Sequence, residues 1–295
     1  MLKSRLLLVV LMVTMGIVPT WAQEATKDAT KQSDLESTIK NAIDELAALE
    51  SKFDKKLRAM PRNEQRAYYN ENQPDAAPFI ARVKKAVSAN SADPAAAAGL
   101  NFLIQRSQRG DDKTKAWASD LALKHHRNDA KCMGTVIGGC ERDYSVKSAG
   151  ILESLGTHRD SQIAIPALFS KIERLKSLAG AAKRFGGITD DKMKKGWIDH
   201  FGDDVIASFT DVDSAKTESK AETMLRALAK NPDLAKVKYR RGTYADAVND
   251  KLFVLDNLAV GKKAPEILGT DVDGTEFKLS DYRGKAVLLD FWGHW

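Results

Sequence analysis

Apolar residues recur at alternating spacings of four and three along the segment 33–58. The stripe consists of Leu35, Ile39, Ala42, Leu46, Leu49 and Phe53. This spacing places the side chains on one helix face and is typical of a coiled coil. Ser33 with Glu36 forms a capping box, which predicts that the helix begins at Ser33. The stripe either packs on its own domain or forms a homodimer through 35–53, and the pattern leaves both readings open.

The pattern remains helical from Phe79 to Leu258. Asp93 followed by Pro94 is a typical helix start. Further helices are predicted at 146–156, 161–178, 191–209, 213–230 and 243–258. Their connections contain Gly, Asp, Asn or Pro, and no internal repeat is visible. We therefore predict a mainly α fold in which residues 33–258 form an irregular domain of helical hairpins.

The pattern changes in the C-terminal segment 261–295. Residues 266–270 and 276–279 contain strand formers and flank the turn sequence Asp-Val-Asp-Gly, which predicts a hairpin. Residues 286–292 form an apolar run interrupted by one acid, as expected of a strand that is buried on both faces. The sequence thus predicts a helical-hairpin domain followed by an incomplete α/β domain, of which the first hairpin and the central strand are present.

The N-terminus has the three-part pattern of a secretory signal peptide. A short basic region precedes an apolar run at 6–18, and small residues stand three and one before a cut after Ala22. The run is shorter than the about 20 residues that span a bilayer. We expect a signal peptide at 1–22, a disordered tether at 23–32 and export to the periplasm or cell envelope, with no membrane span after cleavage.

Charge and cysteine content narrow the function classes. The 295 residues carry 46 Lys and Arg against 40 Asp and Glu, a balance too mild and too evenly spread to indicate nucleic-acid binding.

Cys132 and Cys140 are the two cysteines. Eight positions along an unbroken helix separate their Cα atoms by roughly 12 Å, whereas a disulfide needs less than about 7 Å. A helix break at Gly138-Gly139 would permit a disulfide, so a disulfide, two buried inert thiols and a redox-active pair all stay open.

Histidine positions do not favour a metal site. His125 and His126 are adjacent, so on a helix they project about 100° apart. No His-Glu-x-x-His motif accompanies them or the separate His158 and His200. We expect surface or core histidines, no metal and no cofactor.

The C-terminal segment carries a specific order of residues. It contains Gly261, Ala264-Pro265, Asp273-Gly274, Phe277–Lys285 and Val287–Trp295. In order and spacing these residues resemble the opening of a thioredoxin-like domain of the alkyl hydroperoxide reductase/thiol-specific antioxidant (AhpC/TSA, redoxin) family. Within that family they are most similar to the exported TlpA/ResA-like members. The family-motif positions are Pro265, Gly274, Gly284, Asp290, Phe291, Trp292 and Trp295.

The resemblance implies a thiol-disulfide oxidoreductase, or less closely a thiol peroxidase, that acts on protein thiols and disulfides. In the family, the first cysteine of a Cys-x-x-Cys motif directly follows the residue that matches Trp295. Asp290 matches an acid that relays a proton near this pair, and Trp292 and Trp295 match its aromatic wall. Because this sequence ends before that cysteine, we expect a truncated domain without thioredoxin-type turnover. The alternative is a periplasmic helical binding or scaffold protein with a vestigial redoxin segment.

Overall fold

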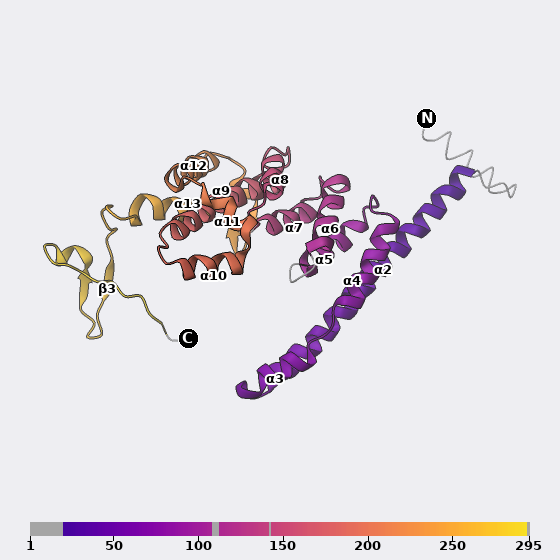
Figure 1. Ribbon diagram of the computed structural model, residues 1–295, viewed down its shortest axis with the longest axis horizontal. Coiled ribbons are helices and arrows are strands. Elements are labelled where there is room, and N and C mark those ends of the chain that lie inside the picture. Colours follow the sequence, from indigo (N-terminus) through magenta and orange to yellow (C-terminus); the bar gives the residue numbers. More distant parts are fainter. Residues whose placement is uncertain (1–19, 108–111, 142, 294–295) are drawn as a thin grey trace. The chain divides into compact units, whose positions relative to one another are not determined.

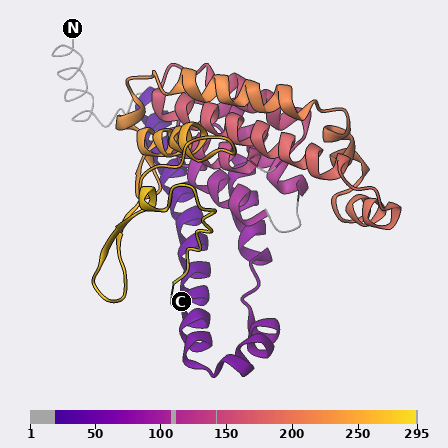
Figure 2. The ribbon, with the colours of Figure 1, turned by 90° about the vertical axis from the view of Figure 1, so that its left-hand side faces the viewer.

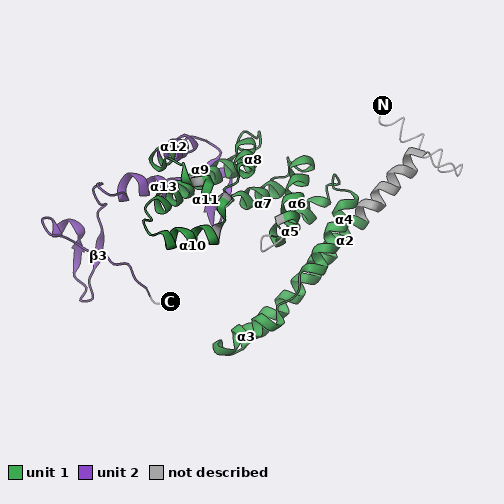
Figure 3. Ribbon diagram, in the orientation of Figure 1, with its two compact units in different colours: residues 1–218 green, residues 219–295 purple. Residues whose placement is uncertain are grey.

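The computed structural model describes residues 20–107, 112–141 and 143–293. The chain divides into two compact units, residues 1–218 and 219–295 (Figure 3). Most of the predicted signal peptide lies outside the described residues. The predicted domain boundaries at 22 and 258 stay predictions. Within the described part of the chain, no helix is long and apolar enough to cross a membrane.

Unit 1 is built from helices, as the sequence predicts. They are α2 (Thr20–Ala59), α3 (Arg62–Asn72), α4 (Ala77–Ala89), α5 (Ala96–Arg106), α6 (Asp112–His125), α7 (Ala130–Cys140), α8 (Val146–Gly156), α9 (Ser161–Gly186), α10 (Asp191–Phe201) and α11 (Asp203–Thr210). Many consecutive helices pack on each other, most extensively α5 on α6 and α8 on α9. Helices α2 and α4 lie side by side in both views of the ribbon (Figures 1 and 2). The mainly α prediction is confirmed.

Helix α2 begins earlier than the capping box predicts. It starts at Thr20, so Ser33 lies inside it and residues 23–32, expected as a disordered tether, are helical. This prediction was wrong because it took the absence of a periodic apolar pattern as a sign of disorder. The segment 20–32 contains Ala, Glu, Lys and Gln and no Gly or Pro, and these residues favour a helix without any apolar stripe.

The apolar stripe of α2 packs within its own chain. Ile39, Ala42, Leu46 and Phe53 are buried, whereas Leu49 is 48% exposed. The helices that pack on α2 are α3, α4 and α5. The own-domain reading of the stripe is therefore confirmed. A homodimer through 35–53 stays a prediction, and it would have to use Leu49 and the polar positions, because the other apolar positions of the stripe are already largely covered.

The core of unit 1 joins α2, α4, α5, α6, α7, α8 and α9. Its largest fully buried side chains include Ile39, Leu46, Leu100, Leu103, Met133, Leu152, Leu155 and Ile163. Gly99 lets α5 approach closely: a Cβ atom there would lie 2.6 Å from Val87 Cγ2 and 3.1 Å from Ile39 Cδ1. A side chain at this position would force the helices apart, so the absence of one is a packing requirement.

The predicted helix at 191–209 is interrupted. Gly202 has φ 84°, a left-handed conformation that ends α10 and separates it from α11. The buried side chains of this region are Ala181, Ala182 and Ile206. Phe185 and Trp197 pack against them, with ring centroids 6.1 Å apart. The break lets two short helices cover the end of α9 where one straight helix was predicted.

Unit 2 contains most of α12 (Ser214–Leu228), followed by shorter elements. They are η2 (Leu234–Lys236), β1 (Lys238–Tyr239), β2 (Gly242–Thr243), α13 (Tyr244–Phe253), η3 (Val254–Leu258), β3 (Leu268–Thr270), β4 (Glu276–Lys278) and η4 (Leu279–Tyr282). Helix α13 begins with a capping box in which Thr243 and Asp246 satisfy each other's backbone N–H groups. The helix packs on η2 and on the small β1–β2 ladder. The predicted helices at 213–230 and 243–258 thus correspond to α12 and to α13 with η3.

Candidate functional site

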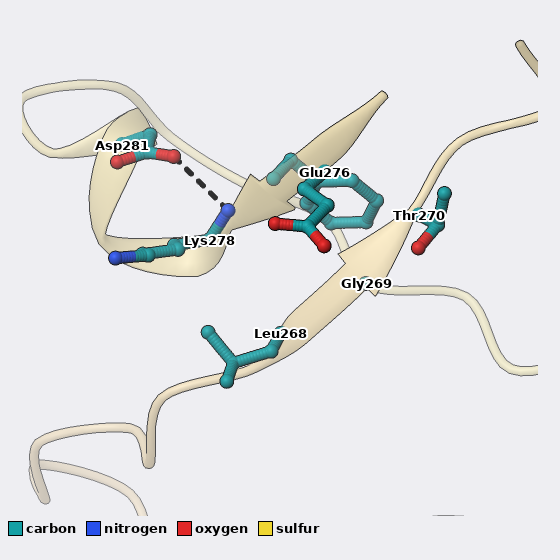
Figure 4. Close-up of a pocket in the computed structure, with 7 residues that line it drawn as sticks. Leu268, Gly269, Thr270, Glu276, Lys278 and Asp281 are labelled. Carbon is teal, nitrogen blue, oxygen red and sulfur yellow. Dashed lines mark hydrogen bonds between the residues drawn. The ribbon is translucent and has the colours of Figure 1, made fainter. Parts of the chain in front are cut away.

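The C-terminal hairpin, to which the family motif points, forms as predicted. Strands β3 and β4 are antiparallel, with Leu268 opposite Lys278 and Thr270 opposite Glu276. A further ladder bond runs from Leu279 N–H to the Ile267 carbonyl, at 2.9 Å. The strands therefore form a short but complete two-stranded ladder (Figure 4).

The hairpin turn depends on one acid and one glycine. The Asp271 carboxylate accepts hydrogen bonds from the backbone N–H groups of Asp273, at 2.9 Å, and Thr275, at 2.8 Å. Gly274 has φ 84°, which a residue with a Cβ atom adopts only with strain. The family-motif residue Gly274 therefore has a local structural role in this chain.

Two carboxylates that the sequence analysis missed hold the end of the hairpin. Glu266 Oε1 accepts from Ser280 N–H at 2.9 Å, and Asp281 Oδ2 accepts from Lys278 N–H at 3.0 Å. The hydrogen bonds from Ser280 hold the pKa of the Glu266 carboxyl below its usual value. Asp281 sits at the third position of η4 and accepts the N–H of the residue before that helix, but Lys278 is no typical N-cap residue, so the sequence carries no capping-box signal here.

Gly284 and Pro265, two further motif residues, also affect the backbone conformation around the hairpin. Gly284 has φ 80° in the turn that follows η4. Lys285 N–H bonds to the Tyr282 carbonyl across this turn, at 3.1 Å. Pro265 is half-buried and stands just before β3. These positions set the path of the chain into and out of the hairpin.

An open pocket lies on this hairpin (Figure 4). Its lining consists of Leu268, Gly269, Thr270, Glu276, Phe277, Lys278 and Asp281. The ring of Phe277 lies across Gly269, since a Cβ atom there would be 2.6 Å from Phe277 Cζ. The lining offers carboxylates and an amine but no thiol or imidazole, so the pocket itself holds no nucleophile for disulfide exchange.

The predicted buried strand at 286–292 does not form. These residues have no ladder partner, and Leu288 is 94%, Phe291 83% and Trp292 75% exposed. The prediction was wrong for this chain because a strand needs a neighbour to satisfy its N–H and C=O groups and cover its side chains. The described residues supply no such neighbour.

The motif residues after the hairpin are therefore not gathered into a site. Asp290 is exposed and has no hydrogen bond or ion pair to any described residue. Phe291 and Trp292 follow it in extended, exposed chain. Trp295 lies outside the described residues. Among the described residues, the thioredoxin-like part thus consists of a formed hairpin and an extended segment that joins no strand ladder.

The two cysteines are buried thiols at opposite ends of α7. Gly138-Gly139 does not break this helix, and both Cys132 and Cys140 are free. Burial raises the pKa of the Cys132 thiol to about 12, and burial also raises the pKa of Cys140. A high pKa keeps a thiol protonated and unreactive, so this arrangement fits the inert-thiol reading of the sequence.

Two of the described histidines, His126 and His158, make structural hydrogen bonds. His126 is buried, and its Nε2 donates to the Ser91 carbonyl at 2.8 Å. His158 Nε2 donates to Asn128 Oδ1 at 3.1 Å. In the described part of the chain, no three His, Cys, Asp or Glu side chains gather as metal ligands would.

Curated relatives match a short stretch of this chain. It is 58% identical over 38 residues to the thiol-disulfide oxidoreductase ResA of Geobacillus kaustophilus, covering 13% of this chain and 22% of that protein. The ResA of Geobacillus thermodenitrificans is 46% identical over 52 residues, covering 18% and 28%. The ResA of Bacillus subtilis is 40% identical over 40 residues, covering 14% and 22%. No family model and no solved structure matches the chain.

These matches define the class of the segment. The chain spans about a quarter of the length of the curated relatives it matches. It contains a partial, ResA-like segment of a thioredoxin-like domain. The resemblance drawn from the residues of 261–295 is confirmed at this level.

Proposed function

We propose that this chain is part of an exported thiol-disulfide oxidoreductase and that 261–295 opens its thioredoxin-like domain. The observation that carries the proposal is the 58% identity over 38 residues to a protein named thiol-disulfide oxidoreductase. The formed hairpin β3–β4 agrees with it, because the motif residues Gly274 and Gly284 both occupy turns that require positive φ. The signal-peptide pattern at 1–22 supports export.

The proposed chemistry needs two cysteines beyond Trp295. The thiolate of the first attacks one sulfur of a substrate disulfide and releases one substrate thiolate. The second attacks the mixed disulfide, so the substrate leaves as a dithiol and the two cysteines remain as a disulfide. A helix N-terminus lowers the pKa of the first cysteine. Asp290 is proposed to relay the proton, and Trp292 to line the site.

Cys132 and Cys140 do not supply this chemistry. They lie in the helical unit and lack the Cys-x-x-Cys spacing. Their raised pKa values oppose thiolate formation near neutral pH. We therefore propose that residues 1–295 by themselves have no thioredoxin-type turnover.

Sequencing of the gene past the codon for Trp295 tests the proposal, together with the intact mass of the protein from its source. We expect the frame to continue into Cys-x-x-Cys and the mass to exceed that of this chain. N-terminal sequencing is expected to begin at Gln23. A stop codon after Trp295, with a mass that fits residues 23–295, would rule out the oxidoreductase function for this product.

A helical binding or scaffold protein is the second candidate. The observation that favours it is the core of unit 1, which buries large side chains such as Leu100, Met133 and Leu155 without any part of the C-terminal segment. A domain with its own core can act without the hairpin. If no cysteine pair follows Trp295, we propose this binding or scaffold function in place of the oxidoreductase function.

A further inference from the structure

A cluster of basic and polar side chains lies on unit 1, far along the chain from the hairpin. It occupies the place where the loop before α7 meets the turn between α8 and α9, three helices that pack on one another (Figure 1). The cluster lines an open pocket of about 340 Å³. Its members are Arg127, Asn128, Ser154, Thr157, His158 and Arg159.

The two arginines give this pocket a positive charge that its lining does not neutralise. No carboxylate is among the lining residues. Arg127 uses a single nitrogen, Nη2, to donate to the Ser154 carbonyl at 3.1 Å and to Ser154 Oγ at 2.7 Å. Its Nε and Nη1 make no hydrogen bond to any described residue, and neither does the exposed side chain of Arg159. Arg127 is thus held in place by Ser154, and both arginines keep guanidinium donors that bond no described residue.

The neighbouring side chains orient a further donor. His158 Nδ1 accepts from Asp160 N–H at 3.0 Å, so its Nε2 carries the proton that goes to Asn128 Oδ1. This contact fixes the Asn128 amide with its NH₂ group unbonded to the described residues. His158, expected from the sequence to be a surface or core histidine, is here a positioning residue for Asn128.

The acids that directly follow Asn128 and Arg159 in the sequence make their hydrogen bonds elsewhere. Asp129 accepts from Cys132 N–H at 2.7 Å and caps α7, and Asp160 accepts from Gln162 N–H at 2.9 Å and caps α9. Both carboxylates therefore face helix N-termini, whose backbone N–H groups and dipoles favour them there. Neither forms an ion pair with Arg127 or Arg159.

We infer that this pocket binds a phosphate group, with Arg127 and Arg159 as its charge partners and Asn128 as a neutral donor. Arginine forks match phosphate oxygens and form charge-assisted hydrogen bonds. The pocket, at about 340 Å³, has room for a phosphate group, either free or as the headgroup of an anionic lipid. The inference goes beyond the proposed oxidoreductase and does not depend on it, because every residue involved lies in the helical unit.

Calorimetric titration of the full chain with sodium phosphate at low ionic strength tests the site. The variant Arg159→Gln removes an exposed charge that has no partner, so its folding should be unaffected. The matched control is Arg66→Gln on α3, which removes an equally exposed and unpaired charge of the same unit. A second arm measures co-sedimentation with phosphatidylcholine vesicles that contain or lack phosphatidylglycerol.

We expect saturable binding that Arg159→Gln weakens about tenfold or more and that Arg66→Gln leaves unchanged, since a hydrogen bond to a charged group contributes that much. Such binding of free phosphate identifies a small anion as the ligand. The same dependence on Arg159 in the vesicle arm alone identifies a lipid headgroup, and it supports the site equally. Equal weakening by both variants in either arm, or no binding in both arms, overturns the inference.

Discussion

The helical unit and the segment 261–293 differ in the solvent exposure of their apolar residues. Leu100, Leu103 and Met133 are fully buried in the helical core, whereas Leu288 and Phe291 are almost fully exposed. Both sets of residues are strongly apolar, so composition does not explain the difference. A helix satisfies its backbone hydrogen bonds internally and needs only to cover one stripe, whereas a strand needs neighbours for both its backbone and its faces.

Stability and the resemblance to thioredoxin-like proteins therefore lie in separate parts of the chain. The helical unit buries a large apolar surface, and this burial stabilises its folded state. The C-terminal segment has the residues that match ResA-type relatives but contains only a short ladder. An isolated two-stranded hairpin is only marginally stable in water. The following predictions test whether the two regions differ in this way.

The largest effect on stability is expected from a core truncation. Leu103→Ala should lower the free energy of unfolding by about 2–5 kcal/mol, because it removes fully buried methyl groups from α5. Urea unfolding followed by circular dichroism measures this change. Leu288→Ala is the matched control and should change the unfolding free energy by less than about 0.5 kcal/mol. Similar losses in the two variants would show that 286–292 is packed.

The buried thiols should react very slowly in the folded protein. Since burial raises the pKa of Cys132 from about 9 to about 12, its thiolate fraction at a given pH falls roughly a thousandfold. Alkylation by iodoacetamide, followed by mass spectrometry, should label Cys132 and Cys140 only after denaturation. Rapid labelling of either cysteine under native conditions would contradict the inert-thiol reading.

The same shift in the pKa of Cys132 makes stability depend on pH at the alkaline end. The folded state keeps this thiol protonated, so its contribution is complete below the unfolded value of about 9 and is lost as pH rises towards about 12. The variant Cys132→Ala should therefore lose less stability than the original chain between these pH values. Identical pH profiles of unfolding would contradict the shift.

A smaller effect is expected where α5 approaches its neighbours. Gly99→Ala should destabilise the protein by about 1–3 kcal/mol, because the new methyl group would overlap Val87. Gly150→Ala on α8 is the control, since a Cβ atom there meets nothing within 4 Å. It should be neutral or stabilise by up to about 1 kcal/mol. Equal unfolding midpoints for the two variants would contradict the close approach.

The smallest effect should be confined to the C-terminal hairpin. Gly274→Ala places a Cβ atom at φ 84°, which costs about 1–2 kcal/mol. Amide exchange should accelerate at Thr275 and Leu279, whose N–H groups are bonded in the hairpin, while the urea midpoint of the helical unit stays unchanged. Val272→Ala, at an exposed position of the same turn, should leave amide exchange unchanged. A shifted global midpoint in Gly274→Ala would show that hairpin and helices unfold together.

Sequence reasoning succeeded where the determinants are local. The hairpin followed from strand formers around Asp-Val-Asp-Gly, and helix α8 begins and ends at the predicted residues. It failed at the start of α2, where helix propensity without periodicity extended the helix to Thr20. It also missed the pocket around Arg127 and Arg159, because these residues are 32 positions apart and only the packing of α7, α8 and α9 brings them together.

By itself, the sequence determined the helical character of most of the chain, the hairpin with its two turn glycines, and the likeness of the last segment to thioredoxin-like proteins. These depend on periodicity, turn chemistry and residue order, which act over short distances. Tertiary structure alone decided that the α2 stripe is covered within its own chain, that the cysteines are buried and that 286–292 joins no strand ladder among the described residues. Each of those outcomes depends on which distant segment lies alongside, because burial and strand pairing are properties of neighbours in space.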